Sequence, residues 1–482
     1  MEAQGGAKLG KDTLSLVDAV SQSVGFIGPV FSAAFFIPTI AGASFTTRGA
    51  GVATPVSIIL AAIGMLGVGW IVSRFAKRVH AAGSLYDYVT DGFGRRAGFV
   101  AGWVYYGGMT ALTLGIGLAF GGFLSLTLSG IHGIDIGWYW LAIAFWIVAF
   151  VMSYLGVQIS TRAQLVLALV SMVVIFGFSL WVIIKGGVGG NSIDPFNPGK
   201  STGSGIFYGM LYAVIMFIGF ETAANLAEET SEPRRSIPRA IFASVIAVTI
   251  FYVVVAYALL IAFGRDVGQL LDPANFPPLY VAASNPELGG STFGEIVQWL
   301  VVFDIAAVLL GTATGTSRGI FALARDGRLP RVLAHVQPRR RTPDVASAVL
   351  AVGSIAMILI VHWTNGLVFI TDTDPGEWFG MFQFGATFGG LCLTLVYLAV
   401  SVTGFLGQPG EGRGRLAIAG VVGAVVSIAA VYGVVKDAPP VWDLDRIWWF
   451  GAIWVGIGIV IMLVLSARGA FSHDTAGQLQ TD

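Results

Sequence analysis

The amino-acid sequence predicts an all-α integral membrane protein with twelve transmembrane helices, arranged as a five-plus-five inverted repeat in which helices one and six are discontinuous. Composition is the first observation: 55% of the 482 residues are hydrophobic and 11% are charged, whereas soluble domains carry about 25% charged residues. The second is that apolar runs of membrane-spanning length recur along the whole chain. The third is that glycine or proline interrupts the first and the sixth run near the middle.

Twelve apolar runs define the expected spans. They cover about residues 16–42, 50–75, 97–126, 137–155, 161–185, 205–227, 239–264, 294–324, 344–364, 378–404, 415–436 and 446–467. With the N-terminus inside, 20 of the 27 Lys and Arg residues fall on the cytoplasmic side and six on the outer side. Because cytoplasmic loops are enriched in these residues, the bias supports the map and predicts a cytoplasmic-membrane protein with both termini in the cytoplasm.

The spans divide the chain into a tail, one long domain and a second tail. The transporter domain is expected at residues 13–470, between cytoplasmic tails at 1–12 and 471–482. Within it, repeat one covers about 16–185, repeat two about 205–404, and two extra helices about 415–467. The connection at about 265–293 is expected to form short helices over the outer face.

Several other classes of protein do not fit this sequence. The alternating ten-residue segments of a membrane β-barrel are absent. A single cysteine, Cys392, excludes an intrachain disulfide and a multi-cysteine metal site. The five histidines are scattered and no Walker A motif occurs, so neither an enzyme nor an ATP-driven pump is expected. The expected partners are a small molecule and the bilayer, with no cofactor, nucleic acid or obligatory protein partner.

Two interruptions mark the candidate site. The first span contains Gly25 and then Gly28-Pro29, about a dozen residues from its start, and proline removes a backbone donor and clashes with the preceding turn. The sixth span contains Gly219 at a matching depth, two residues before Glu221. An acid at that depth costs about 2.5–3.5 kcal/mol on insertion scales and therefore faces protein or a water-filled cavity. Breaks at matching depth in two five-span halves predict a midplane site between the repeats.

Broken helices offer both signs of charge to a ligand. The N-terminus of a half-helix presents N–H groups to an anion, and carbonyls released at the break accept from a cation. A zwitterionic amino acid carries both charges, so the pattern indicates an amino acid or a related molecule.

Three stretches share the pattern of a known family. They are Gly25-Phe-Ile-Gly-Pro29 followed by Ala82-Gly-Ser-Leu-Tyr-Asp-Tyr88 and Gly98-Phe-Val-Ala-Gly-Trp103; Phe217-Ile-Gly-Phe-Glu221 with Ala227-Glu-Glu229, Pro233-Arg-Arg235 and Ile237-Pro-Arg-Ala240; and Ser317-Arg318 with Ala324-Arg-Asp-Gly-Arg-Leu-Pro330 and Thr342-Pro343. Over residues 12–470 the chain resembles the amino acid–polyamine–organocation (APC) superfamily, in its bacterial amino acid permease branch. The resemblance implies the five-plus-five fold with two further helices, and transport of amino acids or related amines by alternating access.

The resemblance also implies where a substrate would bind. Its carboxylate would meet the backbone around Ile27, Gly28, Pro29 and Val30, and its amine would meet carbonyls near Gly25 and around Phe217 to Phe220. Pro29 departs from the small-residue triplet of many members and supplies no N–H, so neighbouring residues would have to provide the carboxylate contact. Some amine-transporting branches carry a proline near this position, which keeps amines in consideration.

Side chains at the second break leave alternatives open. Phe217 and Phe220 flank Gly219, and they either close over a substrate or pack against neighbouring helices. Glu221 binds a proton, contacts an amine, or accepts a hydrogen bond from a neighbouring helix. The inner acidic and basic loop from Glu228 to Arg239 is expected to be structural, or to pair with residues 326–328 as an inner latch.

The coupling ion stays open among H⁺, Na⁺ and exchange without an ion. By the resemblance, proton-coupled members place a lysine in span five where this chain has Ser171. A hydroxyl suits Na⁺, a hard cation that prefers oxygen ligands, and Gly311 and Thr312 on span eight are expected opposite the break in span one. Asp304 shares their helix face and rivals Glu221 as a proton carrier.

The predicted function is a secondary active transporter that imports a small amino acid with a neutral side chain. The candidate lining is apolar and aromatic with few fixed charges, which suits such a side chain. The alternative is an amine, such as ethanolamine, gamma-aminobutyrate or a polyamine, with Glu221 and Asp304 as its counter-charges.

Overall fold

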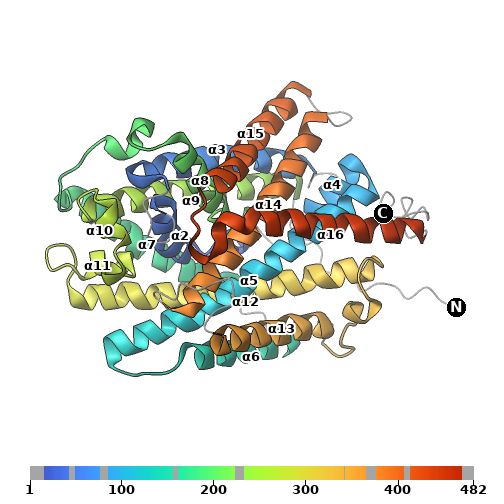
Figure 1. The fold of residues 1–482 in the computed structure, drawn as a ribbon, viewed down its shortest axis with the longest axis horizontal. Coiled ribbons are helices and arrows are strands. Elements are labelled where there is room, and N and C mark those ends of the chain that lie inside the picture. Colours follow the sequence, from blue (N-terminus) through green and yellow to red (C-terminus); the bar gives the residue numbers. More distant parts are fainter. Residues whose placement is uncertain are drawn as a thin grey trace.

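The computed structural model describes residues 16–42, 49–75, 85–155, 161–222, 233–340, 342–364, 376–406 and 413–468. These residues contain twelve helical segments that are long and apolar enough to cross a membrane, which confirms the predicted number of spans. In Figure 1, α4 (Leu85–Phe93) lies at one end of the bundle, and α10 (Val267–Leu271) and α11 (Pro278–Ser284) lie at the other. We call these ends the α4 end and the α11 end.

The helices follow the predicted order. The first span is formed by α1 (Leu16–Ile27) and α2 (Pro29–Ala41), and the others by α3 (Thr54–Phe75), α5 (Arg95–His132), α6 (Trp138–Leu155), α7 (Thr161–Lys185), α8 (Gly203–Ile215), α9 (Pro233–Ala262), α12 (Ser291–Arg325), α13 (Asp344–Trp363), α14 (Glu377–Leu406), α15 (Arg413–Asp437) and α16 (Ile447–Ala467). Short 3₁₀ turns connect them at η2 (Gly51–Ala53), η3 (Asp194–Phe196), η4 (Pro198–Lys200), η6 (Pro273–Asn275), η7 (Arg331–Ala334) and η8 (Val441–Arg446).

Spans one and six are broken, as the sequence predicts. Gly28 separates α1 from α2, at the predicted residue. Span six leaves the α-helix earlier than Gly219 suggests, because α8 ends at Ile215, residues 216–219 form turns and residues 220–222 form a short 3₁₀ turn. The turn that follows α8 carries Glu221 into the protein interior, where 1% of its surface is exposed.

Helices α5 and α14 pack against each other near the middle of the bundle. A methyl group added at Gly389 of α14 would lie 2.8 Å from the carbonyl oxygen of Gly108 on α5. Since real Cβ atoms do not approach a backbone oxygen that closely, glycine is what permits this separation between the two helices. The packing sets the relative positions of Tyr105 on α5 and Tyr397 on α14, which both reach the candidate site.

Other helices lie at the edge of the bundle. In α16 and the turn before it, 11% of the most apolar stretch is buried, against 94% in span one. Helices α6 and α13 pack on each other along one side of the molecule (Figure 1). The outward-facing residues of α6, α13 and α16 are apolar, such as Ile147, Val352 and Ile453, as a surface in contact with lipid acyl chains requires.

The long connection before α12 forms the short helices α10 and α11 with the turn η6 between them, as predicted for residues 265–293. Leu270, Leu279 and Ala283 are buried in this region, so the connection is packed onto the bundle. The two tails and the acidic stretch Glu228 to Glu232 lie outside the described residues.

We predict that close helix packing, rather than glycine itself, sets the stability of the bundle. Alanine at Gly433 of α15 would place a methyl group on the backbone of α8 at Phe207 and Tyr208, whereas nothing lies within 4 Å of the same position at Gly456 on α16. Gly433→Ala should lower the free energy of unfolding by about 1–3 kcal/mol. Gly456→Ala should be neutral or stabilising, because alanine favours a helix by about 1 kcal/mol.

Thermal denaturation of the two purified variants in the same detergent measures this difference. Equal melting temperatures would show that α15 and α8 do not approach as closely as the structure has them.

Candidate functional site

The break in span one depends on Gly28. Its backbone is left-handed, with φ of 57° and ψ of 68°, and it caps the N-terminus of α2, whose first residue is Pro29. Non-glycine residues adopt this conformation at a cost of about 1–2 kcal/mol. A methyl group at this position would also overlap Val308 of α12 and lie 3.4 Å from a carboxylate oxygen of Asp304. Helix α12 is therefore packed directly against the break.

Asp304 provides an acceptor for the first turn of α2. Its Oδ2 atom accepts a hydrogen bond of 2.7 Å from the backbone N–H of Phe31, and the backbone N–H of Val30 lies close enough to interact with the same carboxylate. The side chain is 1% exposed. Hydrogen bonds to a charged group contribute about 1.5–3 kcal/mol each, and the positive end of the helix dipole adds to them. Asp304 thus caps α2 from a different helix.

The break in span six lies against the break in span one. Gly219 has φ of +116°, and a methyl group there would lie 2.6 Å from Cδ1 of Phe26 and 3.1 Å from the backbone nitrogen of Ile27. The hydroxyl of Ser23 on α1 donates to the carbonyl of Phe220 at 3.0 Å. The structure therefore brings the two predicted interruptions into contact.

Glu221 joins three helical segments. Its Oε2 accepts from the backbone N–H of Gly219 at 3.1 Å, and its Oε1 accepts from the hydroxyls of Tyr105 at 3.1 Å and Tyr397 at 3.2 Å. Of the three alternatives weighed for Glu221, this geometry contains the hydrogen bond from neighbouring helices. Tyr397 was missed by the sequence analysis, because nothing local distinguishes it from other tyrosines in the spans.

Two backbone carbonyls at the end of α1 lose their helical donors. The carbonyl of Gly25 would accept from residue 29 in a continuous helix, but Pro29 has no N–H. The carbonyl of Phe26 would accept from Val30 in a continuous helix, but Val30 lies beyond the break and its N–H interacts with the carboxylate of Asp304. These carbonyls lie at the negative end of the α1 dipole, where a cation is favoured.

The aromatic residues at the second break are packed inside the protein. Phe217 and Phe220 are both fully buried. The ring of Phe217 lies 5.7 Å from that of Tyr252 on α9, and the ring of Phe220 lies 5.8 Å from that of Tyr397. Both positions therefore serve packing in this conformation.

The residues considered for a coupling ion are placed as follows. Gly311 faces Phe26, because a methyl group added at this glycine would lie 3.8 Å from Cδ2 of that ring. The hydroxyl of Thr312 donates to carbonyls of its own helix, at 2.9 Å to Val308 and 3.2 Å to Leu309. The hydroxyl of Ser171 on α7 is buried and has no hydrogen-bond partner among the described residues. Within those residues, no three His, Cys, Asp or Glu side chains converge on one point.

An aromatic cluster closes the α11 end above the two breaks. The ring of Phe35 lies 5.2 Å from Phe123, 5.3 Å from Phe382, and 6.4 Å from both Phe276 and Phe379. The cavity beside these rings is about 20 Å³, which is room for about one water molecule. Among the described residues, these rings therefore fill the space between this end and the breaks in this conformation.

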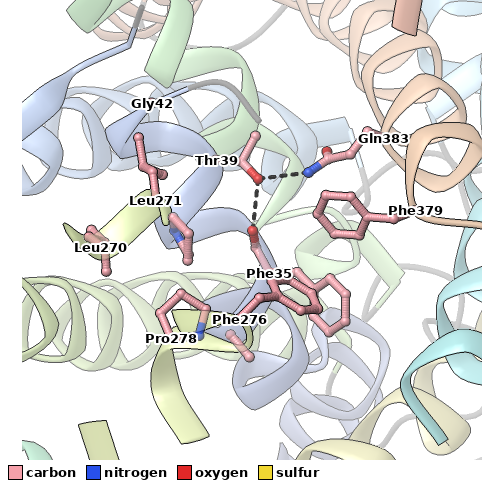
Figure 2. Close-up of a pocket in the computed structure, with 11 residues that line it drawn as sticks. Phe35, Thr39, Gly42, Leu270, Leu271, Phe276, Pro278, Phe379 and Gln383 are labelled. Atoms are coloured by element: carbon pink, nitrogen blue, oxygen red, sulfur yellow. Dashed lines mark hydrogen bonds between the residues drawn. The ribbon is translucent and has the colours of Figure 1, made fainter. Parts of the chain in front are cut away.

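Figure 2 shows the polar pair within this closure. Thr39 lies between Phe35 and Gln383, donates to the carbonyl of Phe35 at 2.8 Å and accepts from the side-chain amide of Gln383 at 2.9 Å. The pair links α2 to α14, so opening this end has to break it.

The α4 end carries a different contact. The hydroxyl of Tyr86 on α4 donates to Asp326 at 2.8 Å, and the guanidinium of Arg328 lies 4.4 Å above the tyrosine ring. Burial raises the pKa of Tyr86 well above its usual value, so the hydroxyl remains a donor. The predicted latch residues 326 and 328 thus pair with α4, and their predicted acidic partners lie outside the described residues.

Comparisons with known proteins agree with this architecture. A family model described as amino acid permease matches residues 14–457. The branched-chain amino acid permease BcaP of Bacillus subtilis is 28% identical over 338 residues, which are 67% of this chain and 69% of that protein. The low-affinity putrescine importer PlaP of Escherichia coli is 27% identical over 363 residues, covering 73% and 75% of the two chains.

One further sequence relative and one solved structure are also similar to this chain. A methylthioribose transporter of Bacillus subtilis is 25% identical over 357 residues, covering 71% of this chain and 74% of that protein. Among solved structures, a manganese transporter of Eremococcus coleocola superposes with a TM-score of 0.52 at 12% identity, covering 94% of this chain and 95% of that one. At that identity the likeness shows a shared fold and nothing about the cargo.

We predict that Gly28 is required both for its backbone conformation and for the space that Val308 occupies. Gly51 has nearly the same φ, 55° against 57°, but nothing lies within 4 Å of its methyl position. Gly51→Ala should therefore lower the free energy of unfolding only by the cost of the backbone strain, about 1–2 kcal/mol. Gly28→Ala should lower the free energy of unfolding by about 1–3 kcal/mol more, because its methyl group also overpacks the site.

Melting temperatures of the two variants, and of Gly28→Ala combined with Val308→Ala, measure the two contributions. Val308→Ala should restore part of the stability lost at Gly28. Equal losses at Gly28 and Gly51, with no recovery in the double variant, would contradict the assignment.

Proposed function

The chain belongs to the amino acid permease family, and we propose that it is a secondary transporter that carries a small amino acid or a related amine across the cytoplasmic membrane by alternating access. Members of this family are permeases, so the protein is a transporter and not an enzyme. Relatives named for branched-chain amino acids and for putrescine support a substrate in this range. A small neutral amino acid and an amine are the two substrate classes that we carry forward.

One observation carries the proposal: the two helix breaks touch inside the membrane-spanning bundle. Residue 219 lies against Phe26 and Ile27, and carbonyls of Gly25 and Phe26 lie at the junction without their helical donors. Unsatisfied backbone groups are costly in a membrane, and such a junction therefore persists where it has a ligand to bind. The surrounding apolar and aromatic side chains suit a small organic molecule.

The closed α11 end supports a transport cycle with one access route open at a time. We propose that this end faces the outside and the α4 end faces the cytoplasm, as the Lys and Arg distribution indicates. Both termini are then cytoplasmic. The aromatic cluster around Phe35 would separate to admit substrate, while the contact between Tyr86 and Asp326 would hold the opposite end.

The driving ion is also part of the proposal. Asp304 and Glu221 are candidates for carrying a proton, because both are buried acids whose partners sit on other segments of the chain. Ser171, Gly311 and Thr312 are the candidates for Na⁺. The hydroxyl of Ser171 is buried and has no hydrogen-bond partner among the described residues, and this observation supports Na⁺ as the alternative to a proton.

We predict that the purified protein exchanges its substrate across a membrane. Proteoliposomes loaded with one unlabelled amino acid or amine should accumulate the same labelled compound by counterflow, for at least one member of a panel of amino acids and amines. Gly28→Ala should abolish the accumulation, because its added methyl group disturbs the junction.

Repeating the assay with Na⁺ and with K⁺, at two pH values, separates the coupling alternatives. A correctly folded protein that shows counterflow with no compound of the panel would contradict the proposed function.

We predict that the aromatic closure controls access from the α11 end. In a Cys392→Ala background, Thr39→Cys should react slowly with a membrane-impermeant maleimide, because Thr39 is 3% exposed and is packed beside Phe379 and Gln383. Adding Phe379→Ala should increase the labelling rate several-fold.

Glu287→Cys, at an exposed position of the same end, gives the rate for an open site. If Thr39→Cys reacts as fast as Glu287→Cys without Phe379→Ala, the cluster is not a closure.

A further inference from the structure

The backbone donors at the start of α2 are already occupied. The N–H of Gly28 bonds the carbonyl of Val24 at 3.3 Å, and the N–H of Ser32 bonds the carbonyl of Gly28 at 2.9 Å. Residue 29 is proline and has no N–H. Of the two that remain, the N–H of Phe31 donates to Asp304, and the N–H of Val30 interacts with the same carboxylate. Every donor of the first turn of α2 is thus used within the protein.

This is the place at which the sequence analysis expected the carboxylate of a substrate. A carboxylate does lie there, but it belongs to the protein: Asp304 reaches α2 from α12, across 273 positions of sequence. The side chain is 1% exposed and is held by the hydrogen bond from Phe31, so it is a fixed part of the site. A second carboxylate would find no free donor and would meet a like charge.

The rest of the junction favours a cation. The carbonyls of Gly25 and Phe26 lack their helical donors, and Glu221 adds a second buried carboxylate beside Gly219. The closest basic residue that follows Asp304 on α12 is Arg318, about 21 Å further along the helix. The side chains and the backbone around the junction therefore present negative charge and acceptor atoms.

We propose that Asp304 is a built-in carboxylate that replaces the one an amino acid would bring, so that the site selects amines without a carboxylate over the corresponding amino acids. The proposal rests on the transport function proposed above and narrows its substrate class. A positively charged amine can interact with the carbonyls of α1 and with the buried acids without having to displace Asp304. An amino acid has to displace Asp304 or leave its own carboxylate unpaired.

If Asp304 were only a structural cap of α2, a different result would be expected. A cap stabilises α2 in the same way whatever the substrate, so its removal would weaken amines and amino acids by the same factor. A specificity-determining carboxylate changes the ratio between the two classes. The ratio is therefore the quantity to measure.

The test uses pairs of compounds that differ only by the α-carboxylate: ethanolamine and serine, isobutylamine and valine, and putrescine and ornithine. Each compound competes for counterflow in proteoliposomes, and its binding is measured separately by thermal stabilisation of the purified protein. For the wild-type protein we expect the amine of at least one pair to bind about tenfold or more tightly than its amino acid, which is the size of one lost hydrogen bond to a charged group.

Asp304→Ala should release the N–H groups of Val30 and Phe31 and shift that ratio about tenfold or more towards the amino acid. Asp304→Asn keeps an acceptor oxygen and removes the charge, so its ratio of amine to amino acid affinity should fall between those of the wild-type protein and Asp304→Ala. Asp194→Asn, at an exposed carboxylate that pairs with Lys200, should leave the ratio unchanged. Size-exclusion profiles identify correctly folded variants, and Asp304→Asn carries the test if the alanine variant does not fold.

The outcomes are distinct. Unchanged ratios in Asp304→Asn and Asp304→Ala, with equal losses for both classes, would make Asp304 a structural cap and overturn the proposal. A wild-type preference for the amino acid in every pair would overturn it as well, while leaving the transport function in place. Silence with every pair and with the wider panel would remove the transport function and this inference together.

Discussion

The structure depends on one constraint: a helix broken inside a membrane has to satisfy the backbone groups that the break releases, because the bilayer core offers no water. Spans one and six are both broken, and their loose ends are met by side chains from elsewhere in the chain. Asp304 accepts from the start of α2, Glu221 accepts from Gly219, and Ser23 donates to Phe220. The contacts of Asp304 and Ser23 join segments that are distant in sequence, whereas the contact of Glu221 with Gly219 lies within the second break. The groups that stabilise the junction are thus the same groups that a ligand would have to address.

This dependence links the site to the motions of the bundle. The bonds from α2 to Asp304 hold the second half of span one against α12, and the bonds from Tyr105 and Tyr397 to Glu221 hold the junction against α5 and α14. A movement that separates these helices breaks hydrogen bonds to buried carboxylates, which is costly unless a ligand or a proton compensates. Local chemistry at the junction is therefore coupled to the position of whole helices. Such coupling is what a binding site needs if it is to open to only one side of a membrane at a time.

Much of the architecture follows from local sequence. The length and apolarity of the runs determine the twelve spans, and Gly28-Pro29 places the first break at the residue where it occurs. The second break is less local: α8 ends at Ile215, four residues before the glycine that marks it, because the turns after it are held by tertiary contacts such as the bond from Tyr252 to the carbonyl of Met216. Sequence patterns locate a weak point in a helix, and neighbouring helices decide where the chain leaves it.

The sequence by itself determined the class of the protein, the number of spans, the two breaks and the two acids worth attention. It did so because glycine, proline and intramembrane charge act on the chain locally, whatever surrounds them. Only the tertiary structure decided which groups the two acids contact. The spacing on α12 shows that Asp304 shares a helix face with Gly311 and Thr312, but only the folded chain shows that its carboxylate accepts a hydrogen bond from the first turn of α2. A hydrogen bond of this kind depends on how α2 and α12 pack, although its two residues are 273 positions apart in sequence. The spacing of residues within either helix does not determine that packing.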